Sequence, residues 1–459
     1  MKTDMKTFDY VVIGAGSGGL LVAVGLLKLG KNVTVVSENI GGDCTHFGCV
    51  PSKTLLHLAK QYQQAPDPEH KAQLKTEALL TVQKTITLFA SEEEAIIPKE
   101  RYFEGTAEFV DKCTIIVKQK TGQQTIRFAK KCIIASGSSP ITIAIPGVPA
   151  DRTITNEEIF YLKRLPKSIS IIGGGPIGAE LATACIGFGI ETRLISRSYL
   201  PKEPKTISKV SLEILIKSGV HYHPARPTKL ENGKLMLDDN TSIPETEYYL
   251  QALGRSPNTK LSLENAGVAY DKTGISVNSN LTTTNSSIFA VGDCTQNPQF
   301  THLAANHGKF VIKKILLPYA KRRERSLPRV TFVNPPIASV GSLEPTISSH
   351  RFELNFTELD KARVNFETDS LGEVSIDTTT GNILGVSLMG HFSEELINVF
   401  TLMIDEKISA LSMTDFITPY PTYGNIFHNL SRDYLTFLSK NWKQHPLGSV
   451  RQLFSYLRS

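Results

Sequence analysis

Two copies of one local pattern constrain the fold of this chain more than any other feature. In the first copy, an apolar strand at 10–13 leads into the glycine-rich loop 14–19 and then into an apolar helix. In the second, a strand at 168–172 leads into the loop 173–178 and another apolar helix. Gly-x-Gly-x-x-Gly between a strand and a helix lets backbone N–H groups approach a pyrophosphate at the positive helix N-terminus. A lone loop could equally be a tight turn before a packed helix. Two copies in full β-α-β context predict two dinucleotide sites, or one flavin and one nicotinamide site.

The residue that follows the second strand differs between the two copies. Glu38 stands at this position in the first copy, and Arg197 stands at the same spacing in the second. An acidic residue suits ribose hydroxyls, whereas an arginine suits a 2′-phosphate. The second site is therefore predicted to bind NADPH in preference to NADH, with Lys202 as a second positive charge. The alternative for Arg197 and Lys202 is a pair of solvated loop residues.

Two cysteines follow the first copy closely. Cys44 and Cys49 are five positions apart in the sequence. Beside a nucleotide site, this spacing predicts a redox dithiol that passes electrons from a bound cofactor to an outside acceptor. A zinc site that includes His46 is the alternative, but structural zinc needs four ligands and no second pair is placed to complete it. Six cysteines in 459 residues do not make a disulfide scaffold, and they suit a reducing compartment.

Composition narrows the class of protein. A length of 459 residues predicts about three domains, and 41% hydrophobic residues can fill several cores. The net charge of +6 comes from 50 basic and 44 acidic residues that are interspersed, so no nucleic-acid partner is expected. The one dense basic run, 321–325, is predicted to be a solvated linker, with a nucleic-acid or membrane contact as the alternative. Neither a signal peptide nor a membrane span is predicted, and we expect a cytoplasmic protein.

The block 41–53, which contains both cysteines and Lys53, resembles the class I pyridine nucleotide-disulfide oxidoreductases. This family includes glutathione reductase, dihydrolipoamide dehydrogenase and mercuric reductase, and the resemblance covers about residues 5–440. Supporting matches lie at 105–107, 135–137, 252–258, 291–293 and 332–341.

The resemblance implies an α/β fold with two Rossmann-like domains and a C-terminal α+β domain. The implied domains are an FAD-binding domain at 1–149, an NAD(P)-binding domain at 150–274, a central domain at 275–328 that completes the FAD site, and a dimerisation domain at 329–459. It also implies a homodimer.

The same resemblance implies residue roles. Cys49 would be the thiolate beside the flavin, and Cys44 the outer thiol that meets the acceptor. Lys53 would lie near the flavin N5, with Glu180 as its ion-pair partner. The implied FAD residues are Gly14, Gly16, Gly19, Glu38, Gly42, Lys53, Ala107, Ser136, Gly137 and Asp293. Those of the nicotinamide nucleotide are Gly173, Gly175, Gly178, Arg197, Lys202 and Gly254. The acidic ribose ligand of the family normally lies one position earlier, at Ser37, so Ser37 and Glu38 both remain open for that role.

The C-terminal region departs from the family pattern. Members that reduce disulfides carry His-Pro-Thr followed by a glutamate, whereas Tyr420 and Asn425 stand here. A tyrosine, with an ordinary pKa near 10, is a poor proton shuttle at pH 7. Mercuric reductases resemble this chain in carrying tyrosine, although the C-terminal cysteine pair of full mercuric reductases is not in this sequence. Tyr420 is expected to be catalytic, and His46 and His428 remain alternatives for proton transfer.

The predicted reaction is a relay from NADPH through FAD and the Cys44–Cys49 disulfide to a metal ion, a quinone or an unusual disulfide. A helix that starts near Pro51, together with nearby positive charge, is expected to keep both thiolates ionised. The rival enzyme is dihydrolipoamide dehydrogenase. A rival of another class is a non-catalytic flavoprotein, either a redox sensor or a subunit of a complex.

Overall fold

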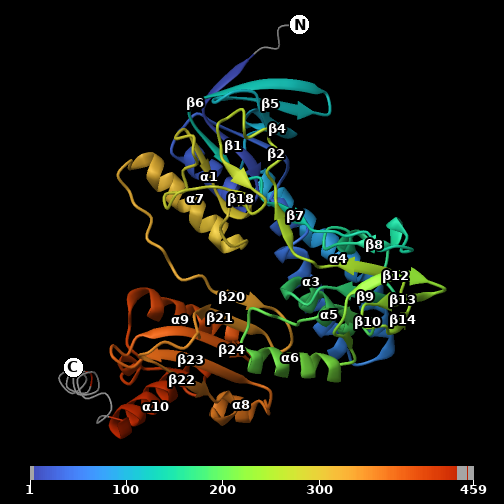
Figure 1. Ribbon diagram of the computed structural model, residues 1–459, viewed down its shortest axis with the longest axis vertical. Coiled ribbons are helices and arrows are strands. Elements are labelled where there is room, and N and C mark those ends of the chain that lie inside the picture. The colour runs from blue at the N-terminus through green and yellow to red at the C-terminus, as the bar shows by residue number, and fades with distance from the viewer. Residues whose placement is uncertain (1–4, 442–451, 453–459) are drawn as a thin grey trace. The chain divides into compact units, whose positions relative to one another are not determined.

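The computed structural model describes residues 5–441 and residue 452 (Figure 1). The chain divides into two compact units. Unit 1 comprises 1–173, 187–191 and 226–323, and unit 2 comprises 174–186, 192–225 and 324–459. This division crosses the second glycine-rich pattern, so the four domains expected from the sequence stay a prediction.

The first glycine-rich pattern belongs to the main sheet of unit 1. Its strand order is β3-β2-β1-β6-β5-β4, with β19 beside β6. The strands are β1 (Lys6–Ala15), β2 (Val33–Ile40), β3 (Tyr102–Glu104), β4 (Thr106–Phe109), β5 (Thr114–Gln119), β6 (Gly122–Ile134) and β19 (Ile288–Ala290). The pairs β1–β2, β1–β6, β2–β3 and β6–β19 are parallel, whereas β4, β5 and β6 pair antiparallel.

The apolar run in β1 is buried on both sides, as a central parallel strand requires. Val11 and Ile13 belong to one core cluster, and Tyr10 and Val12 to the other. On the second side, α1 (Ser17–Lys28) packs against α7 (Thr301–Leu316), as Figure 1 also shows. Gly18 allows this approach, because a Cβ there would lie 3.0 Å from the Ala304 carbonyl oxygen.

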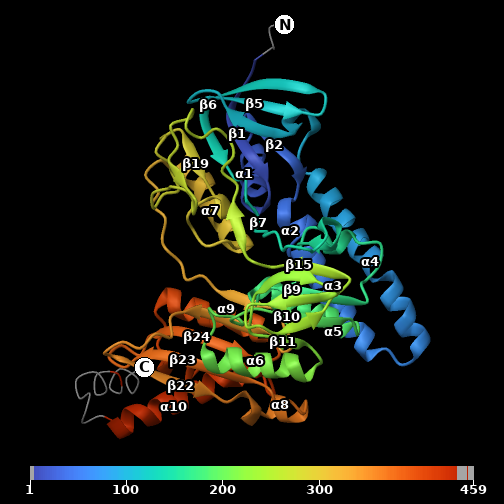
Figure 2. The same ribbon diagram turned by 45° about the vertical axis from the view of Figure 1, so that its right-hand side comes forward.

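Three helices follow β2. They are α2 (Gly42–His46), α3 (Cys49–Gln64) and the long α4 (Pro68–Glu94), which runs beside α3 (Figure 2). Asp67 caps α4 by accepting a hydrogen bond from the His70 amide at 2.8 Å, and Pro68 occupies the first helical position. Both cysteines therefore lie on helices rather than in an irregular loop.

The second pattern also forms a strand, a loop, a helix and a strand. These are β9 (Ser168–Ile172), α5 (Pro176–Gly187) and β10 (Glu191–Ile195). Within unit 1, β9 pairs in parallel with β15 (Tyr248–Gln251), which pairs in parallel with β8 (Thr153–Ile154). Within unit 2, β10 pairs in parallel with β11 (His221–His223), and α6 (Lys205–Lys217) follows β10 along the chain.

Smaller sheets complete unit 1. A three-stranded antiparallel sheet contains β12 (Pro227–Glu231), β13 (Lys234–Leu237) and β14 (Ser242–Pro244). The pair of β7 (Ser138–Pro140) and β16 (Arg255–Pro257) is antiparallel, as is that of β17 (Tyr270–Asp271) and β18 (Gly274–Ile275).

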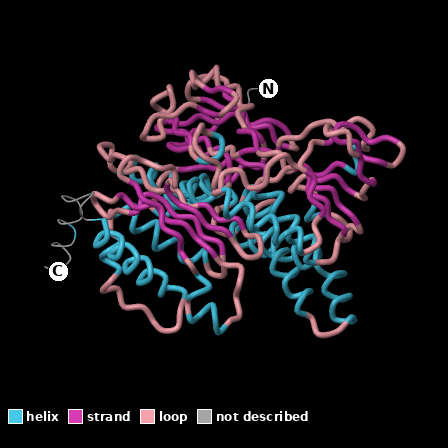
Figure 3. Tube along the Cα trace, turned by 60° about the horizontal axis from the view of Figure 1, so that its bottom comes forward, coloured by secondary structure: helices cyan, strands magenta, loops and turns pink. Residues whose placement is uncertain are grey.

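The C-terminal part of unit 2 is the α+β layer that the sequence predicts. An antiparallel sheet has the order β20-β21-β24-β23-β22 (Figure 3). Its strands are β20 (Arg329–Thr331), β21 (Ile337–Gly341), β22 (Ser349–Leu354), β23 (Leu371–Asp377) and β24 (Ile383–Met389), and its helices are α8 (Asp360–Val364), α9 (Ser393–Glu406) and α10 (Ile426–Asn441). Phe400 of α9 and Phe427 of α10 pack with Leu388 of β24 in one core.

The basic run 321–325 is not simply a solvated linker. Arg322 is half-buried and anchored to unit 1: its Nε donates to the Ser279 carbonyl at 3.1 Å, and its Nη1 lies 2.9 Å from His307 Nε2. In unit 2, Arg325 forms an ion pair with Asp405 at 3.5 Å. The sequence expectation was wrong at Arg322 because a partner fifteen residues away on α7 was not visible in the local composition.

In the part of the chain that the structure describes, no helix is both long and apolar enough to cross a membrane.

Candidate active site

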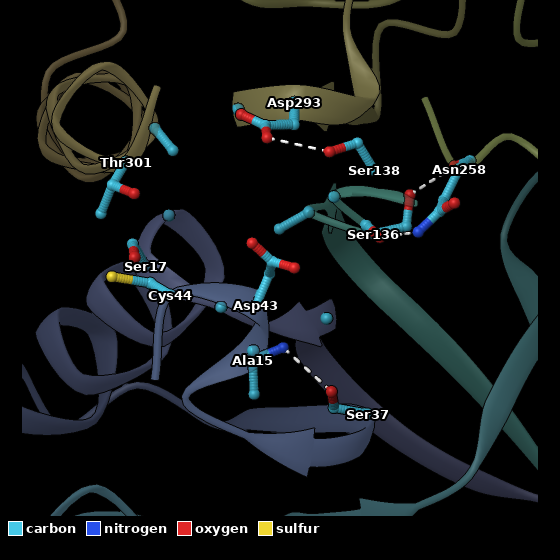
Figure 4. A pocket seen from close by; sticks show the side chains of 18 of the residues that line it. Ala15, Ser17, Ser37, Asp43, Cys44, Ser136, Ser138, Asn258, Asp293 and Thr301 are labelled. Atoms are coloured by element: carbon cyan, nitrogen blue, oxygen red, sulfur yellow. Dashed lines mark hydrogen bonds between the residues drawn. The ribbon is translucent and has the colours of Figure 1, made fainter. Parts of the chain in front are cut away.

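A pocket of about 330 Å³ lies where the first glycine-rich loop meets α2 and two turns of unit 1 (Figure 4). Its lining includes the sequence-predicted residues Gly14, Gly16, Glu38, Gly42, Cys44, Ser136, Gly137 and Asp293. The pocket thus brings together segments that lie as far apart in the chain as the first glycine-rich loop and the start of α7.

Three predicted FAD residues do not line this pocket. Gly19 lies within α1, where a Cβ would meet the Gly14 carbonyl oxygen at 2.0 Å. Ala107 is buried in β4 and belongs to the core of the sheet. Lys53 is half-buried on α3. The first two positions are explained by close packing, and a cofactor role for all three stays a prediction.

The glycines of this pocket allow backbone segments to pack closely and leave room for a ligand beside the backbone. Gly14 has a φ of +98°, and a Cβ there would lie 2.2 Å from the Ala135 carbonyl oxygen. Gly42 has a φ of +60°, and its Cβ would lie 2.7 Å from the Gly16 Cα. Side chains would strain these turns and fill the cradle. Gly16 is also the N-cap of α1, so the positive end of that helix faces the cradle.

Both residues that the sequence left open for the ribose line the pocket. The Ser37 hydroxyl is engaged with the backbone, because it accepts from the Ala15 amide at 3.2 Å and donates to the Asn39 carbonyl at 2.7 Å. The Glu38 side chain is exposed. This arrangement favours Glu38 for a ligand contact.

Arg255 is a site residue that sequence reasoning did not assign. Its Nη2 donates to Asp43 Oδ1 at 2.8 Å and to the Ser138 carbonyl at 2.7 Å, and its Nε donates to Ser138 Oγ at 2.8 Å. Ser138 Oγ in turn donates to Asp293 Oδ2 at 3.0 Å. Burial raises the pKa of both carboxyls, and the Arg255 charge opposes this shift. The family match at 252–258 contains Arg255, but its role could not be predicted because its partner Asp43 lies 212 positions away in the sequence.

One guanidinium nitrogen of Arg255 stays unsatisfied. Among the described residues, Nη1 is buried without a hydrogen-bond partner, and the side chain is only 10% exposed. A buried unpaired donor is costly, so such a group marks a place for an acceptor that is not part of the protein. With the glycine cradle and the α1 N-terminus, it fits the anionic diphosphate of a dinucleotide. The residues present therefore fit FAD.

The two cysteines are not joined in a disulfide, and Cys44 lines this pocket. Cys44 is half-buried on α2, and Cys49 is exposed at the first position of α3. Cys49 Sγ lies 3.6 Å from Thr301 Oγ1, which begins α7 and also lines the pocket. Thr301 was not predicted, because only the tertiary structure brings α7 to the dithiol.

The expectation that both thiols ionise is wrong for Cys44. A hydrogen bond to Cys49 and burial both raise the pKa of the Cys44 thiol. The hydrogen bond to Cys49 and burial therefore oppose ionisation of the Cys44 thiol. Negative charge on Cys49 is favoured by its place at the N-terminus of a 16-residue helix, which begins two residues before the predicted Pro51.

The two histidines offered as proton shuttles lie in different units. His46 is half-buried, and its Nε2 lies 2.7 Å from the Ile40 carbonyl, so this nitrogen carries a proton and donates it to the backbone. His428 is half-buried on α10 in unit 2. His46 is therefore engaged by a hydrogen bond with the end of β2.

In unit 2, the two substituted positions have new partners. The Tyr420 hydroxyl donates to Asp360 Oδ2 at 2.7 Å, and the Tyr420 residue is 73% exposed. Asn425 closes a capping box: its Oδ1 accepts from the Thr422 amide at 3.1 Å, and its Nδ2 donates to Thr418 Oγ1 at 2.9 Å. Asn425 thus stabilises its own turn instead of orienting Tyr420.

The second glycine-rich loop also depends on close approach. Gly173 has a φ of +122°, and a Cβ would lie 2.2 Å from the Ala252 carbonyl oxygen, whereas Gly175 faces open space. Gly254 has a φ of +105°, and Gly178 is buried in α5. Both Arg197 and Lys202 are exposed, and their role in nucleotide binding stays a prediction.

Glu180 is buried on α5. Its Oε1 accepts from the Phe332 amide at 2.9 Å, which ties α5 to the segment after β20 within unit 2. Its ion pair with Lys53 stays a prediction.

Comparison with known proteins decides the family. The model of the pyridine nucleotide-disulphide oxidoreductases matches residues 8–308, and the model of their dimerisation domain matches 327–431. The chain belongs to this family. It is an FAD-dependent enzyme that uses a nicotinamide cofactor, and the dimerisation domain supports a homodimer.

The similar proteins are named for different activities. The chain is 30% identical to a mercuric reductase of Shewanella putrefaciens, over 91% of this chain and 79% of that protein. It is equally 30% identical to a dihydrolipoyl dehydrogenase of Geobacillus stearothermophilus, over 91% and 94%. The Cu(II) complex of the flavoprotein disulfide reductase RclA from Escherichia coli superposes with a TM-score of 0.84 at 26% identity, over 93% and 99%.

Proposed function

We propose that this enzyme passes electrons from NADPH through FAD and the Cys44–Cys49 pair to an acceptor, and that a thiol-bound metal ion is the acceptor class that suits it best. A quinone or an unusual disulfide remains within the proposed range. The observation that carries this choice is the pairing of the Tyr420 hydroxyl with Asp360, together with the use of Asn425 in its own turn.

The pairing matters because disulfide reduction needs protons. Each new thiol requires one, and a group with a pKa near the working pH supplies it best. The Asp360 carboxylate raises the pKa of Tyr420 further above its ordinary value. A phenol in this state is a poorer acid–base catalyst than an isolated tyrosine. Reduction of a metal ion bound to thiolates transfers electrons without this requirement.

The proposal gives the chain's own residues distinct tasks. Bound FAD supplies the two-electron carrier between the nicotinamide and the dithiol. Arg255, the first glycine-rich loop and Asp293 hold and orient it, and Lys53 with Glu180 is proposed to act beside it. Cys49 would be the thiol beside it, while Cys44 would bind the acceptor and release its proton to solvent as it does so. One NADPH then reduces one two-electron ion or two cupric ions.

The comparisons support a metal-ion acceptor without deciding it. Mercuric reductases from several bacteria are 28–31% identical to this chain. The similar RclA is known as a Cu(II) complex, as is a cysteine-to-serine mutant of that protein. In the described residues no cluster of three or more metal-ligating side chains occurs, so the metal would be a transient substrate held by the thiols.

The test is anaerobic NADPH oxidation by the purified FAD-loaded enzyme. Mercuric ion, cupric ion, a quinone, lipoamide and glutathione disulfide are supplied separately. Rapid turnover with a metal ion, and slow turnover with both disulfides, is the expected result. Rapid turnover with lipoamide or glutathione disulfide alone would refute the metal-ion proposal and direct attention to His46 or His428.

Dihydrolipoyl dehydrogenase activity is the second candidate, because enzymes of that name are as similar as the mercuric reductases. It predicts fast lipoamide turnover and preference for NADH. A non-catalytic sensor would be reduced once by NADPH and then stop with every acceptor.

A further inference from the structure

The loop 196–204, which follows β10, carries the two exposed positive residues Arg197 and Lys202. This loop lies against the second glycine-rich loop, because the Leu200 amide donates to the Gly174 carbonyl at 2.7 Å. A Cβ on Gly174 would lie 2.2 Å from a carbonyl oxygen of the loop. Gly174 and the loop both belong to unit 2. The two positive residues are therefore carried by a segment in close contact with the glycine-rich turn.

The backbone of this loop is held by packing. Leu200 is buried and has a φ of 41°, which non-glycine residues rarely adopt. Such a conformation persists only where the surrounding structure determines it. The Glu203 amide donates to the Leu200 carbonyl at 3.0 Å, and Ser208 Oγ donates to the Tyr199 carbonyl at 2.5 Å. The contacts of the neighbouring residues therefore set the place of the Lys202 backbone.

Glu203 connects the loop to the antiparallel sheet of the dimerisation domain. Its side chain is only 7% exposed. Arg329, the first residue of β20, places its Nε 3.3 Å from Glu203 Oε1, and the Ser339 hydroxyl of β21 donates to Glu203 Oε2. A carboxylate buried to this degree needs such partners, since an unpaired charge away from water is strongly unfavourable. The pairing thus fixes the end of the loop on the sheet.

Arg329 also contacts the backbone of Lys202. Its Nη2 donates to the Lys202 carbonyl at 3.2 Å. One guanidinium therefore holds two consecutive residues of the loop, Lys202 through its main chain and Glu203 through its side chain. The donors of a guanidinium have a fixed planar arrangement, so the two contacts together orient this part of the loop, and a lysine could not reproduce both.

A second buried ion pair joins α6, rather than the loop, to the same sheet. Glu373 of β23 has a side chain that is 8% exposed; it accepts a hydrogen bond from the Thr206 hydroxyl and lies 3.0 Å from Arg351 Nη1. Thr206 belongs to α6, which packs against β24 (Figure 2). This pair already docks α6 on the sheet. The contact of Arg329 with the Lys202 backbone is additional to that docking.

We propose that Arg329 is a positioning residue for NADPH. By holding the backbone of Lys202 and the side chain of Glu203, it would orient Lys202 toward the 2′-phosphate and so contribute to the choice of NADPH over NADH. The inference rests on the NADPH part of the proposed function. Arg329 would act through Lys202 and would not contact the nucleotide itself.

The test measures binding of NADP⁺ and of NAD⁺ to the FAD-loaded enzyme by isothermal titration calorimetry. The two nucleotides differ only in the 2′-phosphate, and neither can reduce the flavin. We expect Arg329→Gln to weaken NADP⁺ binding by roughly tenfold, the scale of one hydrogen bond to a charged group, and NAD⁺ binding by less than about twofold. Arg329→Lys should show most of this loss, because it keeps the charge without the two contacts. In turnover assays, the KM for NADPH should rise by a similar factor while that for NADH should not.

Two comparisons separate positioning from a merely structural role. Arg351→Gln is the matched control, because it breaks the other buried pair; it should change NADP⁺ binding by less than about twofold. The double variant Arg329→Gln/Lys202→Ala should bind NADP⁺ as weakly as Lys202→Ala alone, because both changes remove the effect of one side chain. If Arg329→Gln does not fold, Arg329→Lys, which keeps a positive charge beside Glu203, takes its place in each comparison.

The outcomes distinguish the two proposals. A wild-type enzyme that binds NAD⁺ as tightly as NADP⁺ would refute the NADPH part of the proposed function, and this inference with it. A wild type that prefers NADP⁺, with the same preference in Arg329→Gln and Arg329→Lys, would overturn only the role of Arg329. Equal losses with both nucleotides, an equal loss in Arg351→Gln, or an additive loss in the double variant would each show a general structural role and would also overturn the inference.

Discussion

The nucleotide pocket of unit 1 and the Tyr420 region of unit 2 follow the family pattern to different degrees. Gly14, Gly16, Gly42, Cys44 and Asp293 line one pocket, and a Cβ on Gly14 would lie 2.2 Å from a carbonyl oxygen. Around Tyr420, two side chains differ from the disulfide-reducing members and have acquired other partners. The pocket of unit 1 is constrained by backbone contact that few substitutions tolerate, whereas the Tyr420 region depends on exposed side chains that can change.

The largest expected effect is the loss of turnover when Cys44 is replaced, because this change separates reduction of the flavin from reduction of the acceptor. Cys44→Ser should abolish reduction of every acceptor, because the outer thiol is lost, while NADPH still bleaches the flavin absorbance. Stopped-flow absorbance and steady-state turnover measure the two steps. Cys113→Ser is the control, since Cys113 is a half-buried cysteine outside the pocket. Full turnover in Cys44→Ser would rule out the dithiol relay.

The second effect tests the input region alone. Arg197→Glu should raise the KM for NADPH by about tenfold or more and leave that for NADH nearly unchanged, because a carboxylate would face the 2′-phosphate. Lys209→Glu, another exposed change on the neighbouring α6, should have little effect. An unaltered preference for NADPH in Arg197→Glu would contradict this assignment.

A third effect concerns the support of the pocket. His307 on α7 is fully buried, with the Gly292 amide 3.3 Å from Nδ1 and Arg322 Nη1 2.9 Å from Nε2. Burial and the Arg322 charge lower the pKa of His307 to about 4. In the unfolded chain this histidine has an ordinary pKa near 6.5 and binds a proton more readily than in the folded protein. The stability gained by burying neutral His307 is therefore complete above pH 6.5 and is lost as the pH falls toward 4.

The expected loss is at most about 1.4 kcal/mol per pH unit in this window. Urea unfolding of the FAD-loaded enzyme, followed by flavin release, measures it between pH 7 and pH 4. His307→Gln, which cannot titrate, should show a shallower slope. Identical slopes in the two proteins would mean that His307 is not the group responsible.

The smallest effect concerns the acceptor region. Asn425→Ala removes both capping hydrogen bonds of its turn and should cost about 1 kcal/mol of stability. Turnover with a metal ion should persist, because Asn425 no longer serves a catalytic pair. Asn398→Ala is the matched control, since that side chain bonds only a carbonyl of its own helix. A strong loss of turnover without loss of stability would show that Asn425 still acts in catalysis.

The sequence by itself determined the parts of this protein that depend on neighbouring residues. Both strand–loop–helix patterns and the C-terminal α+β layer follow from local glycines and from the period of apolar residues. The family followed from the block around Cys44 and Cys49. Each of these features depends on residues that are close together in the sequence.

Only the tertiary structure decided the contacts between distant side chains. Arg255 pairs with Asp43, Thr301 reaches Cys49, and Asp360 binds Tyr420, in each case across at least 60 residues. The solvated linker predicted at Arg322 failed for the same reason, since a buried histidine on α7 lies against it. The sequence gives the charge and the hydrogen-bonding capacity of each side chain. Which partner that side chain contacts depends on tertiary packing, because many residues of the same type are available along the chain.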